Sequence, residues 1–135
     1  MQIILFTPPS DRKILDGEKT MTARYWKRKP PKVGDLIAAQ TEYSKSTRFA
    51  ILKIKNVFKW HISVNFSIFF LDDILGGWKV PSKRKLKNIA IQEGFDLWIN
   101  FLHEYHRLNA NKFDKFSSPK RTHYFIEFEL VEDLS

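Results

Sequence analysis

The chain has 135 residues, of which 43% are hydrophobic and 15% are aromatic, enough for one domain with its own core. These values exclude a disordered, collagen-like or low-complexity chain, and no apolar run is long enough to span a membrane. The sequence contains no cysteine, and its first residues lack a signal-peptide pattern. We therefore expect a single cytoplasmic domain over residues 1–135 without membrane attachment.

The charge of the chain is strongly basic. Twenty-three lysines and arginines stand against 15 acidic residues, which leaves a net charge of +8. Such an excess is typical of proteins that bind polyanions, most simply RNA or DNA. The alternative is a solvated basic surface that serves solubility. The sequence does not indicate a protein partner, and a monomer is the simplest expectation.

The first part of the chain predicts two extended segments around a short helix. Residues 3–6 form an apolar run typical of a strand. Ser10 or Asp11 can cap a helical turn that Gly17 ends, and residues 20–25 read as extended.

Three further strands are predicted by apolar runs or alternation at 36–39, 49–58 and 124–130. In the second of these, one face is expected to be buried and the opposite face carries Lys53 and Lys55; the buried face holds Ala50, Leu52, Ile54 and Phe58. The segment 61–82 is mixed in character, and no element is assigned to it.

Two helices are predicted between the last two strands. Residues 86–93 and 98–105 have apolar side chains at helical spacing. Gly94 separates the two helices, Asp96 can cap the second, and residues 109–120 read as a loop. The order of elements predicts an α+β fold, with a small curved sheet or barrel and helices inserted before the last strand.

Glu93 departs from two local rules. It continues the apolar stripe of its helix, and it lies at the helix C-terminus, where the macrodipole disfavours an anion. A carboxylate in such a position indicates a functional site. The alternative is that the helix frays and Glu93 points to water.

The stretch after Gly17 offers a similar choice. In a strand, Thr20, Thr22 and Arg24 share one face, whereas the turn leaves the direction of Lys19 undetermined. Cations beside threonine hydroxyls can bind a phosphate or polarise a carbonyl. Alternatively, they are exposed charges that protect an edge strand from aggregation.

The run from Ile14 to Arg24 contains an apolar pair followed by Gly-x-Lys-x-x-Thr-x-Arg, and it resembles the signature of ASCH domains. The resemblance continues in order through residues 32–35, 90–95 and 123–128, but not through 58–82 or the lysine-rich loop 112–121. It implies a PUA-like small mixed β-barrel with helices packed beside it. It also implies a cleft that faces RNA or a nucleoside.

Some bacterial ASCH proteins are amidohydrolases that remove the acetyl group from N4-acetylcytidine. By motif position the resemblance carries their lysine, threonine and glutamate to Lys19, Thr22 and Glu93, with Arg24 as a supporting cation. It thus implies a hydrolase in which Thr22 is the nucleophile, Lys19 the base and Glu93 an acid or base.

The protonation of Lys19 decides how such a site could work. A lysine accepts a proton only in its neutral form, which requires a pKa below its usual value of about 10.4. Burial and Arg24 lower that pKa, whereas Glu93 raises it. If Glu93 lies close to Lys19, we expect the carboxylate to handle the leaving-group proton; otherwise Lys19 is the better base.

A bound cytosine also needs a stacking partner. Tyr25, Trp26 and Phe6 can provide one, and Thr20 can contact the substrate beside them. Each of these aromatic residues is also a natural core residue.

Two basic clusters can contact RNA phosphates or simply be solvated. They are Lys27, Arg28 and Lys29, and Lys83, Arg84 and Lys85. His103 and His106 lie three residues apart, but the sequence shows no third ligand beside them. We therefore expect neither a metal ion nor a cofactor.

Two other functions remain open. One is a non-catalytic RNA-binding module that uses the same basic cleft, and the other is a ribonuclease for single-stranded RNA. The basic loop and the longer middle segment indicate a substrate context different from that of compact deacetylases.

Overall fold

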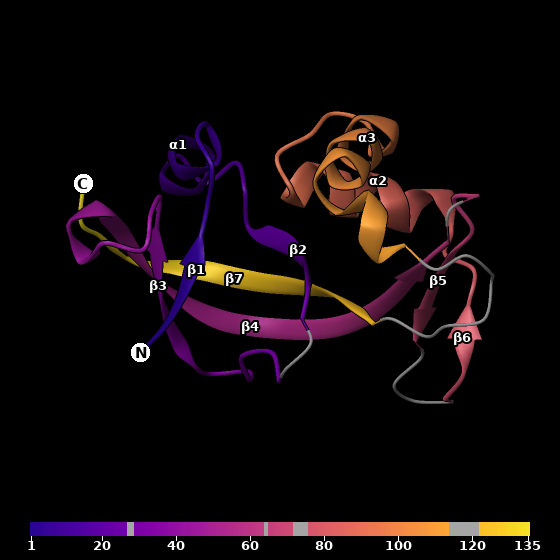
Figure 1. Ribbon diagram of the computed structural model, residues 1–135, viewed down its shortest axis with the longest axis horizontal. Coiled ribbons are helices and arrows are strands. Elements are labelled where there is room, and N and C mark those ends of the chain that lie inside the picture. Colours follow the sequence, from indigo (N-terminus) through magenta and orange to yellow (C-terminus); the bar gives the residue numbers. More distant parts are fainter. Residues whose placement is uncertain (27–28, 64, 72–75, 114–121) are drawn as a thin grey trace.

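The computed structural model describes residues 1–26, 29–63, 65–71, 76–113 and 122–135 (Figure 1). In chain order the elements are β1 (Gln2–Leu5), α1 (Ser10–Leu15), β2 (Met21–Tyr25), β3 (Leu36–Gln40), η1 (Lys45–Thr47), β4 (Arg48–Ile62), β5 (Ile68–Leu71), β6 (Trp78–Lys79), α2 (Lys83–Gln92), α3 (Trp98–Asn109), η2 (Ala110–Lys112) and β7 (His123–Asp133).

The strands of the described residues form one mixed sheet around β4. Along one edge β4 pairs antiparallel with β3 and β5, and along the other it pairs antiparallel with β7. β1 extends β3 in parallel, β2 extends β7 and β6 extends β5, the last two antiparallel. In Figure 1, β4 and β7 form a long curved ribbon, with α1 and the α2–α3 pair above its two halves.

The architecture is the expected α+β fold, with two helices inserted before the last strand. The barrel is not closed, however, which corrects the expectation in one respect. Within the described part of the chain β2 pairs only with β7, and β1 pairs only with β3. An opening therefore separates β1 from β2.

Two hydrophobic clusters lie on opposite faces of the sheet. On β7, Ile126 belongs to the first and Phe125 to the second, and consecutive strand residues point to opposite faces. The first cluster fills the curved interior beneath α1 and includes Ile14. The second includes Trp60 and is covered by apolar residues of α2 and α3 such as Phe101. Among the described residues, no helix has the length and hydropathy needed to cross a membrane.

The long strand β4 differs from its prediction because it continues to Ile62, into the first two residues of the unassigned segment 61–82. Strands β5 and β6 also lie in that segment. A bulge between Ile54 and Asn56 changes the register against β7, and such a bulge bends a strand. Beyond it, Phe58 is only half-buried, and it packs with the second cluster rather than with Ile54 in the first. One strand therefore serves both cores.

Two predicted caps are wrong. Helix α1 begins after Pro9 without a side-chain cap, and Ser10 and Asp11 lie inside its first turn. Helix α3 begins after Leu97, also without a side-chain cap, so Asp96 does not have the predicted role. Helix α2, in contrast, is capped by the hydroxyl of Ser82.

Candidate functional site

The turn after α1 fixes the backbone of Lys19. Gly17 has a φ of +79°, which favours glycine, and the N–H groups of Glu18 and Lys19 both donate to the carbonyl of Lys13. One residue later, the Thr20 N–H donates to the Gln92 carbonyl at 2.7 Å. The turn is thereby joined to the C-terminal end of α2.

The end of α2 fixes Glu93. Gly94 has a φ of +87°, and a Cβ at this position would lie 3.0 Å from Cδ of Lys13. The Lys13 ammonium donates to the Gly94 carbonyl at 2.8 Å and lies 5.2 Å from the centre of the Phe95 ring. A cation at the carbonyl end of the helix offsets the macrodipole that disfavours the Glu93 carboxylate.

Lys19 and Glu93 form a buried ion pair. Lys19 Nζ lies 2.7 Å from Glu93 Oε1 and also donates to the Glu93 backbone carbonyl at 3.2 Å. The two residues are only 6% and 3% exposed. The alternatives in which Glu93 points to water and Lys19 is a surface charge are therefore wrong.

Burial shifts the pKa of each partner in the direction that favours the neutral form of its side chain. It lowers the pKa of Lys19, although Glu93 acts in the opposite direction. It raises the pKa of Glu93, and the neighbouring Lys19 and Arg24 oppose that rise. The charged and neutral forms of the pair are thus closer in free energy than they would be in water, which suits a pair that exchanges a proton.

Thr22 and Arg24 project from β2 on the same face, as the strand alternation predicts. Arg24 Nε donates to Thr22 Oγ1 at 3.1 Å, and Arg24 Nη2 donates to the Leu5 carbonyl at 2.6 Å. The guanidinium also lies 5.0 Å from the centre of the Phe6 ring. Burial lowers the pKa of Arg24, but a guanidinium stays charged in proteins.

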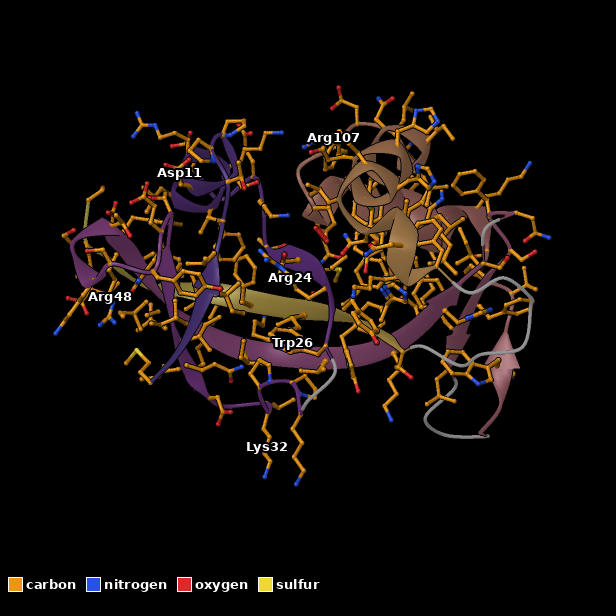
Figure 2. All side chains as sticks on the ribbon, viewed as in Figure 1. Asp11, Arg24, Trp26, Lys32, Arg48 and Arg107 are labelled. Atoms are coloured by element: carbon orange, nitrogen blue, oxygen red, sulfur yellow. The ribbon has the colours of Figure 1, made fainter. Side chains whose placement is uncertain are left out.

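A cavity of about 610 Å³ lies at the opening between β1 and β2, within the usual size range of ligand sites. Lys19, Thr22, Arg24 and Glu93 all line it. In Figure 2, Arg24 lies between α1 and the α2–α3 pair, with Arg107 on the facing side of α3. The four residues singled out in the sequence are therefore brought together at one cavity.

The remaining predicted substrate contacts separate into two groups. Phe6 lines the cavity although it is buried in the first cluster. Thr20, Tyr25 and Trp26 are not among its lining residues. The Tyr25 ring instead contacts His123, and Trp26 packs against Tyr124, so the structure does not bring these three to the cavity.

The basic clusters lie away from the cavity where they are described. Lys29 is exposed, whereas Lys27 and Arg28 lie outside the described residues, as does most of the loop 112–121. Lys83, Arg84 and Lys85 are exposed in the first turn of α2. The ammonium of Lys85 lies 4.5 Å from the centre of the Phe70 ring.

Several cavity residues were not predicted from the sequence. They are Lys13 on α1, Phe95 after Gly94, and Phe101, Glu104, Tyr105 and Arg107 on α3. Phe95 could have been found from its place directly after the unusual glutamate and its glycine. The α3 residues carry no such signal, because their helical pattern also describes an ordinary core face.

The described residues hold no group of three or more acidic, histidine or cysteine side chains that could bind a metal ion. His103 and His106 are both exposed on α3. His106 contacts the aromatic rings of Phe66 and Phe113.

The fold, an open mixed sheet with helices inserted before its last strand, is similar to that of solved ASCH-domain structures. The chain is similar to an ASCH domain from Lactobacillus crispatus, with 16% identity, coverage of 96% of this chain and 78% of that chain, and a TM-score of 0.58. It is also similar to an ASCH protein from Zymomonas mobilis, with 10% identity, coverage of 98% of this chain and 72% of that chain, and a TM-score of 0.52. A protein from Enterococcus faecalis is similar with 15% identity, coverage of 99% of this chain and 82% of that chain, and a TM-score of 0.59.

No protein-family model and no curated protein matches the chain. At these identities the likeness is one of fold. The structural likeness therefore confirms, at the level of the fold, the resemblance to ASCH domains stated from the sequence.

Proposed function

We propose that this protein is an ASCH-type amidohydrolase that removes the acetyl group from N4-acetylcytidine. The observation that carries the proposal is the buried ion pair between Lys19 and Glu93 in the same cavity as Thr22 and Arg24. Replacing both members of a buried ion pair by apolar residues of similar volume is often neutral for stability. Stability alone therefore does not account for this pair, whereas a functional role does.

In the proposed reaction the Thr22 hydroxyl attacks the acetyl carbonyl carbon. The bond between Oγ1 and carbon forms, and the bond between carbon and N4 breaks, which leaves an acetyl ester on Thr22 and free cytidine. Water then hydrolyses the ester to acetate and restores the hydroxyl. The Arg24 guanidinium, which already donates to Thr22 Oγ1, stabilises negative charge as it develops on the oxygen atoms.

The proton balance of this step uses the ion pair. The proton that leaves Thr22 passes to the Lys19–Glu93 pair, and the pair returns a proton to the leaving nitrogen. Because Lys19 Nζ lies 2.7 Å from Glu93 Oε1, a proton moves within the pair from the ammonium to the carboxylate. Neutral Lys19 then accepts the Thr22 proton, and protonated Glu93 delivers its proton to the leaving nitrogen. Their opposite pKa shifts toward neutrality make this exchange less costly.

The apolar wall of the cavity suits a flat base. Phe6, Phe95 and Phe101 contribute rings to it, and aromatic rings stack on nucleobases without a hydrogen-bond code. Phe95, which is half-buried, takes the place that the sequence suggested for Tyr25 or Trp26.

Purified protein incubated with N4-acetylcytidine should release cytidine, which chromatography separates from the substrate. We expect Thr22→Ala to abolish this release. Lys32→Met is the control for a lost cation, because Lys32 is exposed and projects away from the helices (Figure 2). Release by wild type no faster than by Thr22→Ala would refute the proposal.

A second candidate is a non-catalytic RNA-binding module, favoured by the +8 charge and by the exposed basic residues outside the cavity. It predicts RNA affinity that falls steeply with salt and survives Thr22→Ala. Salt-insensitive or absent binding would refute this candidate. Fragmentation of a labelled RNA oligonucleotide that is lost in Lys19→Met would instead indicate a ribonuclease, provided that a contaminating nuclease is excluded.

A further inference from the structure

A second buried polar pair borders the cavity on the α3 side, and the reaction described above does not use it. Tyr105, which is 4% exposed, lines the cavity, and its hydroxyl oxygen lies 2.5 Å from His123 Nδ1. The other nitrogen of that ring, Nε2, lies 3.1 Å from the Lys112 carbonyl oxygen. Tyr105 and His123 together connect the wall of the cavity with β7 and η2.

The Lys112 carbonyl determines the direction of both hydrogen bonds. A carbonyl oxygen only accepts, so His123 Nε2 carries the hydrogen and, in the neutral ring, Nδ1 is the acceptor. Tyr105 therefore donates its only hydroxyl hydrogen to Nδ1. Among the described residues the phenol makes no second hydrogen bond. Its oxygen thus offers the cavity lone pairs and no hydrogen, so it can bind only a molecule that brings a donor.

The phenol lies within electrostatic reach of the charged groups of the site. Burial raises the pKa of Tyr105 well above its usual value, the Glu93 carboxylate adds to this rise, and the Arg24 guanidinium opposes it. The hydroxyl therefore stays protonated and does not serve as a base. In the proposed reaction Glu93 acts on the leaving nitrogen, so the phenol lies near the space that the departing nucleoside vacates.

We propose that Tyr105 binds the water molecule that hydrolyses the acetyl ester on Thr22, and that His123 is the positioning residue that orients the Tyr105 hydroxyl. This inference rests on the proposed function and concerns its second step. Once cytidine has left, water enters the vacated space and has two hydrogens to donate. A hydrogen bond to Tyr105 Oη holds the water and leaves a lone pair free for the acyl carbon, which is an advantage of position and orientation.

The proton balance of the second step leaves Tyr105 unchanged. The water oxygen forms a bond to the acyl carbon, and the bond between that carbon and Thr22 Oγ1 breaks. One water proton passes to the Lys19–Glu93 pair, which returns a proton to Oγ1. The other water proton stays on the new acid and is released when acetic acid ionises to acetate. Tyr105 keeps its own proton, which it shares with His123 in a hydrogen bond.

Tyr105→Phe should separate the two steps, because only the second uses the phenol oxygen. With excess N4-acetylcytidine the variant should release about one cytidine per protein molecule in an initial burst at the wild-type rate. Further release should be about 10- to 100-fold slower than in wild type. Intact-protein mass spectrometry should find the added mass of one acetyl group on the variant. This is a new signal that a loss of stability does not produce.

Tyr124→Phe is the matched control, because Tyr124 precedes Phe125 on the same strand and does not line the cavity. It should behave as wild type. Two variants of His123 test its role with Tyr105 in place. Glutamine in His123→Gln can still accept from Tyr105 and donate to Lys112, whereas leucine in His123→Leu can do neither. We expect acetylated protein to accumulate in His123→Leu and not in His123→Gln.

Slower release by Tyr105→Phe without a burst and without acetylated protein would overturn the inference and leave the proposed function intact. Wild-type behaviour of Tyr105→Phe would do the same. If that variant does not fold, the two His123 variants decide, and equal acetylation of both overturns the inference. If wild type releases no cytidine, the proposed function fails and the inference fails with it.

Discussion

Replacing Lys19 by methionine should destabilise the protein far more than the loss of one surface charge. The substitution keeps the length of the side chain but leaves the Glu93 carboxylate, which is 3% exposed, without its counter-charge. At the 2.7 Å separation of the pair, Coulomb's law with an effective dielectric constant near 20 gives an attraction of about 6 kcal/mol. Removing one partner of a buried pair typically costs about 3–5 kcal/mol, and we expect a loss in that range.

The assay is urea unfolding at pH 7, followed by tryptophan fluorescence. Lys32→Met should change the free energy of unfolding by less than about 0.5 kcal/mol, and Lys13→Met by about 1 kcal/mol through its hydrogen bond to Gly94. The double substitution Lys19→Met and Glu93→Met should recover most of the stability, because an apolar pair of similar volume is often neutral.

The pH dependence of the Lys19→Met variant gives an independent test. Burial already raises the pKa of Glu93 in the folded protein, and loss of Lys19 removes the main group that opposes this rise. A folded-state pKa above the unfolded value contributes stability that is complete below the unfolded pKa and is lost as the pH rises through the folded pKa. The stability gap to wild type should therefore shrink from pH 7 to pH 5. A gap that is constant with pH, or no larger than that of Lys32→Met, would refute the reasoning.

Three further predictions concern the residues around this pair. Gly94→Ala should lower the free energy of unfolding in urea by about 1–2 kcal/mol more than Gly34→Ala. Both glycines have a positive φ, but only a Cβ at Gly94 would lie 3.0 Å from Lys13. Equal losses of stability in the two variants would contradict this. Arg24→Lys should lower kcat for N4-acetylcytidine by about 10²-fold or more. An ammonium cannot contact Thr22 and Leu5 in the planar geometry of the guanidinium. An unchanged kcat would show that Arg24 takes no part in the reaction. Thr22→Ser should keep kcat within about tenfold of wild type while the isosteric Thr22→Val abolishes it; activity in Thr22→Val would show that water, not Thr22, is the nucleophile.

The sequence predicted most of the sheet because its buried strands alternate strongly. The alternation at residues 124–130 corresponds to β7, and that at 49–58 to the first two thirds of β4. The prediction that one face of residues 49–58 is buried failed beyond the bulge between Ile54 and Asn56, where one extra residue in β4 changes the register against β7. A bulge depends on the partner strand, so a single sequence does not specify it.

The candidate site was predictable where a residue violated a local rule. Glu93 stands against both its helix stripe and the helix dipole, and the structure buries it beside Lys19. The aromatic residue proposed to stack on the base, Phe95, was not predictable in the same way. Tyr25 and Phe95 are both half-buried aromatic residues, and only the pairing of β2 with β7 places Tyr25 opposite His123. That choice belongs to tertiary structure.

The incomplete barrel and the position of the site have one cause. Among the strands that the structure describes, β2 pairs with β7 alone, and the Thr20 carbonyl accepts from the Phe128 N–H on that side. Because strand groups alternate in direction, the Ala23 N–H points instead to the open edge, where it faces the Glu93 carboxylate. The Arg24 side chain, rather than a backbone ladder, joins this edge to Leu5. Closing the barrel with backbone hydrogen bonds would occupy the groups that line the cavity, so a closed sheet and this site exclude each other.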